Sequence, residues 1–272
     1  TEEATIAKLK ARYDGYHFEE NTVGIYNPFS VLNTLSRLRY KDYWFETGTP
    51  TFLVDLLKMH NYRLPDMTKE RVSDDVINSV DSLSTNPIPV IYQSGYLTIK
   101  QYKPFTKSYK LGYPNQEVKI GMLKSLAPNY LSPVSVDNNG LVNEFVELVY
   151  DGDIEQAMVR LKAYLSGISN RLSNKNERDF QTVFYLIFNL MGAFIKVEEE
   201  SAIGRADAVL QLPNTIYVFE LKYDGSAEDA LRQIDDKGYL IPYTASGKKL
   251  VKVGVNYDST QRTIGEWIIR KG

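Results

Sequence analysis

Residues 204–222, GRADAVLQLPNTIYVFELK, carry the pattern that decides how this chain is interpreted. Two apolar runs flank the dipeptide Pro213-Asn214; the first run contains one carboxylate, and the second contains a carboxylate and an ammonium. Burying such charges without a partner or a metal is unfavourable. The pattern therefore needs a structural or chemical reason.

The dipeptide predicts a hairpin and fixes its register. If Pro213 and Asn214 form a two-residue turn, Asp207 lies directly opposite Glu220, with Cβ atoms about 4.5 to 5.5 Å apart. Lys222 follows Glu220 by two positions and projects from the same face of the strand. The opposite face carries Phe219, Leu221 and Tyr223.

Two carboxylates this close repel each other, and a divalent cation between them keeps both ionised. A small set of oxygen ligands suits Mg²⁺ or Mn²⁺. Lys222 would add a charge suited to orienting a water molecule and to offsetting charge on phosphorus. This interpretation predicts a phosphodiesterase. The alternative is a pair of opposite charges at a solvated sheet edge, which contributes about 0 to 1 kcal/mol, and strand alternation alone leaves both open.

Asp207 followed by Glu220-Leu221-Lys222 resembles the D-x(n)-(D/E)-x-K signature of the PD-(D/E)XK nuclease superfamily, with Ala206 where that family usually has Pro. The likeness extends to a bacterial family in which such a nuclease domain is fused to a truncated, AAA-ATPase-like domain. The segments that carry it are residues 176–188, 204–207, 219–234 and 237–239.

The resemblance implies a fold and a set of roles. The fold is a restriction-endonuclease-like mixed β-sheet core flanked by helices. Asp207 and Glu220, helped by the Leu221 carbonyl, would hold the metal, and Lys222 would be the catalytic lysine. Gln233, on the helix after the motif strand, would support the lysine or the attacking water.

The first helix of that fold often contributes a further acid, and Glu177 is the candidate here, as a catalytic group and a metal ligand. Glu177 and Gln181 lie one helical turn apart, on a face that neighbours Phe184 and Phe188. An equally supported alternative is that Glu177 has no part in the site and only stabilises the helix N-terminus, where an acidic side chain opposes the helix dipole. The three acids 198–200 would alternate between strand faces, which indicates a solvated edge.

The chain as a whole predicts two domains. Residues 1–131 combine short helices, including one at 69–80, with a strand pair within 91–114, which is typical of a winged-helix-like module. Residues 132–140 form the best linker candidate. Residues 141–272 place helices before a strand group joined by hairpins and one helical crossover, which predicts an α/β or α+β domain with a mixed sheet.

Motifs in the first half resemble the end of the AAA-ATPase-like domain and the region that links it to the nuclease. They are residues 13–16, 26–30, 43–50, 93–98 and 111–118. The chain contains no phosphate-binding G-x-x-x-x-G-K-[ST] loop and begins without Met, so we expect no ATP hydrolysis and a missing N-terminal ATPase segment. The aromatic and basic stretch 37–44 either stacks on bases or, more commonly for such sequences, fills a small helical core.

Composition limits the alternatives. The 34 acidic and 32 basic residues nearly cancel, so any nucleic-acid contact needs a local patch. The absence of Cys excludes disulfides, thiolate zinc sites and Cys nucleophiles, and it fits a cytoplasmic location. Two His residues argue against a His-rich zinc enzyme. The longest apolar run, 183–195, is too short for a membrane span of about 20 residues.

These observations lead to one expected function and one alternative. We expect a Mg²⁺- or Mn²⁺-dependent endonuclease that acts on DNA or RNA through water attack. The alternative is a non-catalytic module that binds nucleic acid or protein, keeps the nuclease fold and is controlled by an ATPase-like domain. The oligomeric state stays open, a homo-oligomer included.

Overall fold

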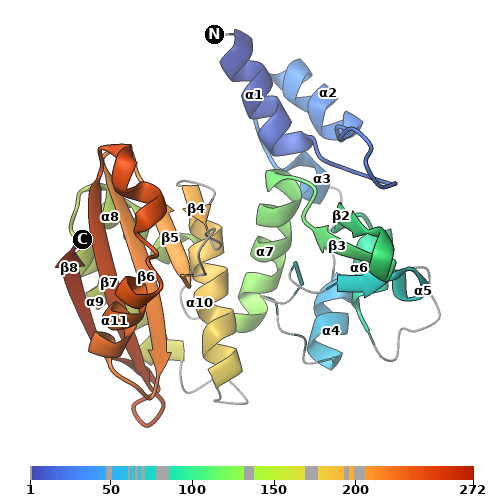
Figure 1. Ribbon diagram of the computed structural model, residues 1–272. Helices are drawn as coiled ribbons and strands as arrows, with labels where there is room; N and C mark the ends of the chain where they lie inside the picture. Colours follow the sequence, from blue (N-terminus) through green and yellow to red (C-terminus); the bar gives the residue numbers. More distant parts are fainter. Residues whose placement is uncertain are drawn as a thin grey trace. The chain divides into compact units, whose positions relative to one another are not determined.

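The computed structural model describes most of the chain and divides it into two compact units, Thr1–Ala127 and Pro128–Gly272 (Figure 1). The described residues are 2–46, 51–60, 62, 64, 67–68, 71–77, 86–131, 138–168, 177–192, 196–198 and 206–272. Among the helices in these ranges, none combines the length and apolar character needed to cross a membrane.

The first unit surrounds a small antiparallel sheet with helices. The strands lie in the order β1 (Arg71–Ser73), β3 (Ser108–Gly112) and β2 (Thr98–Lys103). The helices are α1 (Glu2–Tyr13), α2 (Pro28–Arg37), α3 (Tyr43–Glu46), α4 (Thr51–Met59), α5 (Asp74–Ile77), α6 (Ile88–Gln93) and α7 (Gln116–Tyr130), which runs past the unit boundary.

The predicted strand pair of the first unit is confirmed as β2 and β3, and the helix predicted at 69–80 is confirmed at Asp74–Ile77 but wrong at Arg71–Ser73. Arg71–Ser73 form β1, which pairs with β3, and α5 follows from Asp74. Backbone pairing with β3 and burial of Val72, which is 5% exposed, outweigh local helix propensity here. The ends of the predicted helix, 69–70 and 78–80, lie outside the described residues.

A buried carboxylate ties three helices of the first unit together. Glu117 is fully buried in α7, and its Oε1 accepts hydrogen bonds from Ser30 Oγ in α2 at 2.8 Å and from the Trp44 backbone N–H in α3 at 3.0 Å. Burial raises the pKa of Glu117, and these two hydrogen bonds oppose that shift. Asn115 Oδ1 accepts from the Val118 N–H at 3.0 Å, the helix cap that the sequence predicts.

The second unit is a five-stranded mixed sheet with helices on both faces, which confirms the predicted mixed α/β architecture. The strand order is β4-β5-β6-β7-β8; β6 and β7 run parallel, and the other neighbours run antiparallel. The strands are β4 (Lys196–Glu198), β5 (Ala208–Gln211), β6 (Thr215–Tyr223), β7 (Lys249–Asp258) and β8 (Thr263–Lys271). The helices are α8 (Asn138–Tyr150), α9 (Ile154–Ile168), α10 (Glu177–Met191) and α11 (Ala227–Asp236), and the 3-10 segment Ile241–Ser246 precedes β7.

The hairpin between β5 and β6 has the register that the sequence predicts. Its pairs run from Ala208 opposite Phe219 to Gln211 opposite Ile216, and the Leu212 N–H donates to the Thr215 carbonyl at 2.9 Å across the turn. Extending this register by one residue places Asp207 opposite Glu220.

Alternation along β6 sends side chains to two different layers. On one face, Val218 packs with Leu231 and Ile234 of α11. On the other, the ring of Phe219 meets the ring of Phe188 in α10 edge-on, with 4.9 Å between their centroids. Helix α11, the crossover between β6 and β7, therefore covers the face of the sheet that carries Val218 (Figure 1). Glu220 and Lys222 lie on this same face, because they follow Val218 by two and four positions in the strand.

Candidate active site

Two carboxylates meet at the ends of β5 and β6. Glu220 is only 3% exposed, whereas Asp207 is exposed just before β5. Asp207 Oδ2 accepts a hydrogen bond from the Leu221 backbone N–H at 2.8 Å. The Asp207 carboxylate is therefore held against the β6 backbone, between Glu220 and Lys222.

Gln233 links the acid to the lysine. Its Nε2 donates to Glu220 Oε1, and its Oε1 accepts from Lys222 Nζ. Lys222 Nζ also lies 4.0 Å from Glu220 Oε1. The amide thus presents its donor end to the carboxylate and its acceptor end to the ammonium, which fixes the orientation of the amide.

The Glu220 carboxyl is in an environment that penalises its charge. Burial, followed by the negative charge of Asp207, raises the pKa of Glu220 to about 8; the charge of Lys222, the backbone N–H of Asp207 and the hydrogen bond from Gln233 oppose the shift. Its second oxygen, Oε2, is buried and has no hydrogen-bond partner. A proton or a cation at this oxygen would relieve the cost of burying it.

The donor set suits a hard divalent cation. Asp207 and Glu220 have carboxylate oxygens, the Leu221 carbonyl stays a predicted third ligand, and Mg²⁺ typically takes one or two carboxylates while keeping several waters. Within the described ranges, no cluster of three or more His, Cys, Asp or Glu side chains could hold a metal. A cation here would leave positions for water and for substrate phosphate.

Four further acidic residues, Glu177 and the run 198–200, lie wholly or in part outside the described part of the chain. Glu177 begins α10, but its side chain lies outside the described part of the chain, so its part in the site stays a prediction. Glu198 ends β4 with only its backbone described, and residues 199 and 200 lie outside the described ranges.

The sequence interpretation missed a glycine that brings α11 close to the sheet. Gly254 in β7 pairs with Glu220, and a Cβ at this position would lie 2.3 Å from the Ala227 carbonyl oxygen and 2.9 Å from Leu231 Cγ. Only a residue without a side chain allows α11, and with it Gln233, to pack at this distance. A glycine inside the predicted strand 250–256 was the available signal, because strand glycines often mark a close approach.

Two polar residues in the next row of the sheet anchor the segment between β6 and α11. Glu266 Oε1 accepts from the Ala227 N–H at 2.8 Å, at the positive end of α11, and Asn256 Oδ1 accepts from the Gly225 N–H at 2.9 Å. Asn256 pairs with Lys222 on one side and with Glu266 on the other. Nothing in the local sequence singles out these two residues.

Comparisons with known proteins agree with this geometry. Residues 175–267 match the family model described as the PD-(D/E)XK nuclease superfamily. The chain is also 30% identical, over 96% of its length, to a protein of Azotobacter chroococcum mcd 1 described as "Uncharacterized protein in vnfD 5'region", and it spans 52% of that relative. No solved structure matches the chain.

The AAA-ATPase-like character expected for the first half stays a prediction. The second unit contains a PD-(D/E)XK nuclease superfamily domain.

Proposed function

We propose that the second unit is a metal-dependent nuclease that hydrolyses phosphodiester bonds of DNA or RNA. The observation that supports this best is the connected set formed by Glu220, Gln233 and Lys222, with Asp207 fixed beside it. A surface ion pair does not explain this set, because Glu220 is buried with an unpartnered oxygen.

Asp207, Glu220 and the Leu221 carbonyl would hold Mg²⁺ or Mn²⁺, with Glu177 as a further proposed ligand. Bound there, the cation would supply Lewis-acid chemistry and lower the pKa of water. The two carboxylates bring negative charge to a largely apolar sheet and so create the attraction for the cation. The exposure of Asp207 leaves this end of the sheet open to a substrate phosphate.

Lys222 and Gln233 act on the reacting groups in this proposal. A water oxygen forms a bond to phosphorus as the water releases a proton to the solvent, the bond from phosphorus to the leaving oxygen breaks, and the leaving oxygen takes up a proton from the solvent; negative charge grows on the phosphoryl oxygens on the way. The Lys222 ammonium offsets that charge and orients the water. Gln233 keeps the ammonium in place by accepting its hydrogen bond.

The test is cleavage of plasmid, single-stranded DNA and RNA in Mg²⁺ or Mn²⁺, with wild type compared with Glu220→Ala and Lys222→Ala. We expect cleavage that requires metal and falls at least about 100-fold in both variants, as expected for loss of electrostatic stabilisation of the transition state. Lys249→Ala is the matched control, because Lys249 is an exposed lysine at the start of the adjacent strand β7. It should cleave like wild type.

Two results would contradict the nuclease proposal. Cleavage that survives in both site variants would come from another site or a contaminant. No cleavage by wild type, with Mn²⁺ still bound, would favour the alternative of a non-catalytic binding module that keeps the nuclease fold. The assignment of residues 1–131 to the end of an AAA-ATPase-like domain is a separate proposal, supported by sequence resemblance alone.

A further inference from the structure

An aromatic pocket of about 350 Å³ lies in the first unit. It is lined by segments that are far apart in the sequence: the loop from Tyr16 to Pro28, Trp44 in α3, and the end of α6 with the turn that follows it. Four aromatic residues, Tyr16, Phe18, Tyr26 and Trp44, line the pocket together with the polar residues Asn27 and Gln93. Both amides are held within the unit: Asn27 Oδ1 accepts from the Ser30 N–H at 3.3 Å, and Gln93 Nε2 donates to the Ile77 carbonyl at 3.4 Å. Most of these residues belong to motifs that the nuclease proposal does not use.

The back of the pocket is firmly packed. The Trp44 ring lies 4.9 Å from the Tyr96 ring and 5.3 Å, edge-on, from the Phe45 ring, measured between centroids. The backbone N–H of Trp44 is bound to the buried Glu117. Gly95, with φ of +79°, passes so close to the Tyr16 and Trp44 rings that an added Cβ would contact both. These contacts set the Trp44 ring in place before any ligand arrives.

The front of the pocket is exposed. Phe18 is 69% exposed and Tyr26 is 36% exposed, and the neighbouring Ile25 is 50% exposed. Apolar side chains gathered at the surface around a hollow are a feature of binding sites, because leaving them in water is unfavourable.

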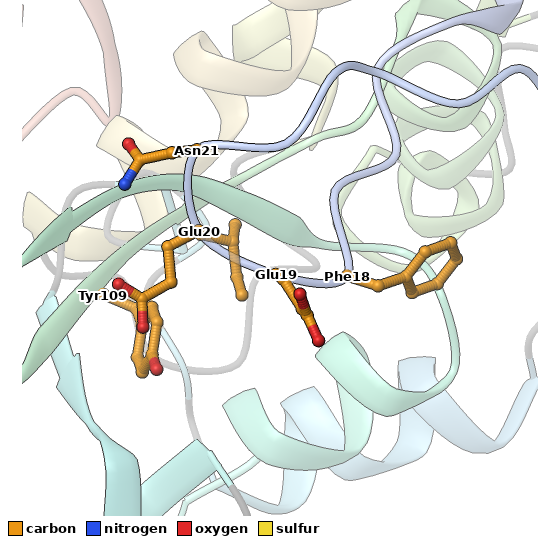
Figure 2. Close-up of a pocket in the computed structure, with 6 residues that line it drawn as sticks. Phe18, Glu19, Glu20, Asn21 and Tyr109 are labelled. Carbon is orange, nitrogen blue, oxygen red and sulfur yellow. The ribbon is translucent and has the colours of Figure 1, made fainter.

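The charge of the lining separates this pocket from its neighbour. A second pocket of about 420 Å³ uses the same loop and is lined by two acids, Glu19 and Glu20, of which Glu20 lies beside Tyr109 (Figure 2). Figure 2 shows the Phe18 ring pointing away from Glu20 and Tyr109. In contrast, none of the described residues that line the aromatic pocket carries a charged side chain. Carboxylates favour a cationic ligand in the acidic pocket, whereas the aromatic pocket offers ring faces on which a flat ligand can stack.

We propose that the aromatic pocket binds a nucleobase. A base is a flat aromatic group, and aromatic side chains such as those of Tyr16, Phe18, Tyr26 and Trp44 stack on its faces. The volume lies within the range of small-ligand sites. The base could belong to a free nucleotide or to an unpaired position of a strand. This proposal goes beyond the nuclease proposal and stands or falls independently of it.

Trp44 provides the readout for a test on the full chain. The protein has two tryptophans, Trp44 and Trp267, so Trp267→Phe leaves Trp44 as the only indole. Its fluorescence is titrated with adenosine, AMP, a deoxyadenosine hexamer and a hexamer of abasic sites. We expect saturable quenching by ligands that carry a base and none by the abasic hexamer.

Phe18→Ala, made in the same background, should weaken binding by at least about fivefold, the lower range for loss of one stacking contact. Phe105→Ala is the matched control, because Phe105 is 99% exposed and lies outside the pocket, and it should leave the affinity unchanged. Both substitutions remove an exposed ring, so neither should unfold the protein.

The ligands distinguish the two sources of the base. Saturation by adenosine or AMP supports the proposal with a free nucleotide as ligand, and saturation by the hexamer alone supports it with a base in a strand. The proposal is overturned if no ligand quenches Trp44, if the abasic hexamer binds as well as the deoxyadenosine hexamer, or if the two Phe variants bind equally.

Discussion

At the residue scale, Glu220 is a buried carboxyl group beside a second acid, Asp207. It is 3% exposed, and one of its two oxygens has no hydrogen-bond partner. Gln233 satisfies the other oxygen and also contacts Lys222. An ionised carboxylate in this position is costly without a cation, so the metal-free protein relieves the cost by keeping a proton.

This carboxyl predicts how the stability of the metal-free protein depends on pH. The pKa of Glu220 is about 8 in the folded protein and 4.5 as its reference value, so between these pH values the folded state holds a proton that the unfolded chain has released. The free energy of unfolding therefore falls as pH rises from about 4.5 to 8, by roughly 2 to 4 kcal/mol from this group. Glu220→Gln removes this titrating group. In EDTA, the free energy of unfolding of the variant should therefore match that of wild type at pH 5 and exceed it at pH 8.

Urea unfolding in EDTA at several pH values measures this difference. Glu228→Gln is the control, because Glu228 lies in the same unit at the surface, paired with Arg270, and should keep the wild-type slope. With Mn²⁺ at pH 8, wild type should become more stable than Glu220→Gln, because metal binding stabilises the folded wild type and not the variant. An unchanged slope in Glu220→Gln would show that Glu220 is ionised in the folded protein.

At the element scale, the β5–β6 hairpin could be predicted from sequence because its causes are local. A two-residue turn and strict alternation determine the register, which runs as expected from Ala208 to Gln211. β1 could not be predicted, because Arg71–Ser73 become a strand only when β3 offers them a partner. A glycine inside a predicted strand signals some close approach, but that α11 is the element approaching Gly254 depends on the tertiary packing.

That close approach makes Gly254 a sensitive position. In Gly254→Ala the new methyl group would clash with the Ala227 carbonyl and Leu231, so α11 must move away from the sheet and carry Gln233 with it. We expect a loss of roughly 1 to 3 kcal/mol in unfolding free energy, as for other overpacked sites, and weaker Mn²⁺ binding measured by calorimetry.

Gly167→Ala is the matched control within the same unit. Gly167 lies in α9, and a Cβ there would have no heavy atom within 4 Å, so the change should be neutral or stabilising by up to about 1 kcal/mol. If Gly254→Ala behaves like Gly167→Ala in both stability and Mn²⁺ affinity, the close packing of α11 does not position Gln233.

At the scale of the whole molecule, the two candidate sites belong to different compact units. The carboxylates and Lys222 lie in Pro128–Gly272, and the aromatic pocket lies in Thr1–Ala127. Each unit has its own sheet and its own buried apolar residues. A ligand stabilises the structure that forms its site, so the two proposed ligands should protect different segments of the chain from hydrogen exchange.

Hydrogen exchange measured by mass spectrometry can locate these protected segments in the intact chain. At a Mn²⁺ concentration about 100 times its Kd, binding adds about 2.7 kcal/mol, so amides in β6 and α11 that exchange through unfolding of the site should slow by up to about 100-fold. The base-bearing ligand identified by Trp44 quenching should instead slow exchange around Tyr16, Trp44 and Gly95. Glu220→Gln should abolish the first effect only, and Phe18→Ala should weaken the second only. Equal slowing of exchange in both units by each ligand would contradict two separate sites, because a ligand stabilises the unit that contains its own site.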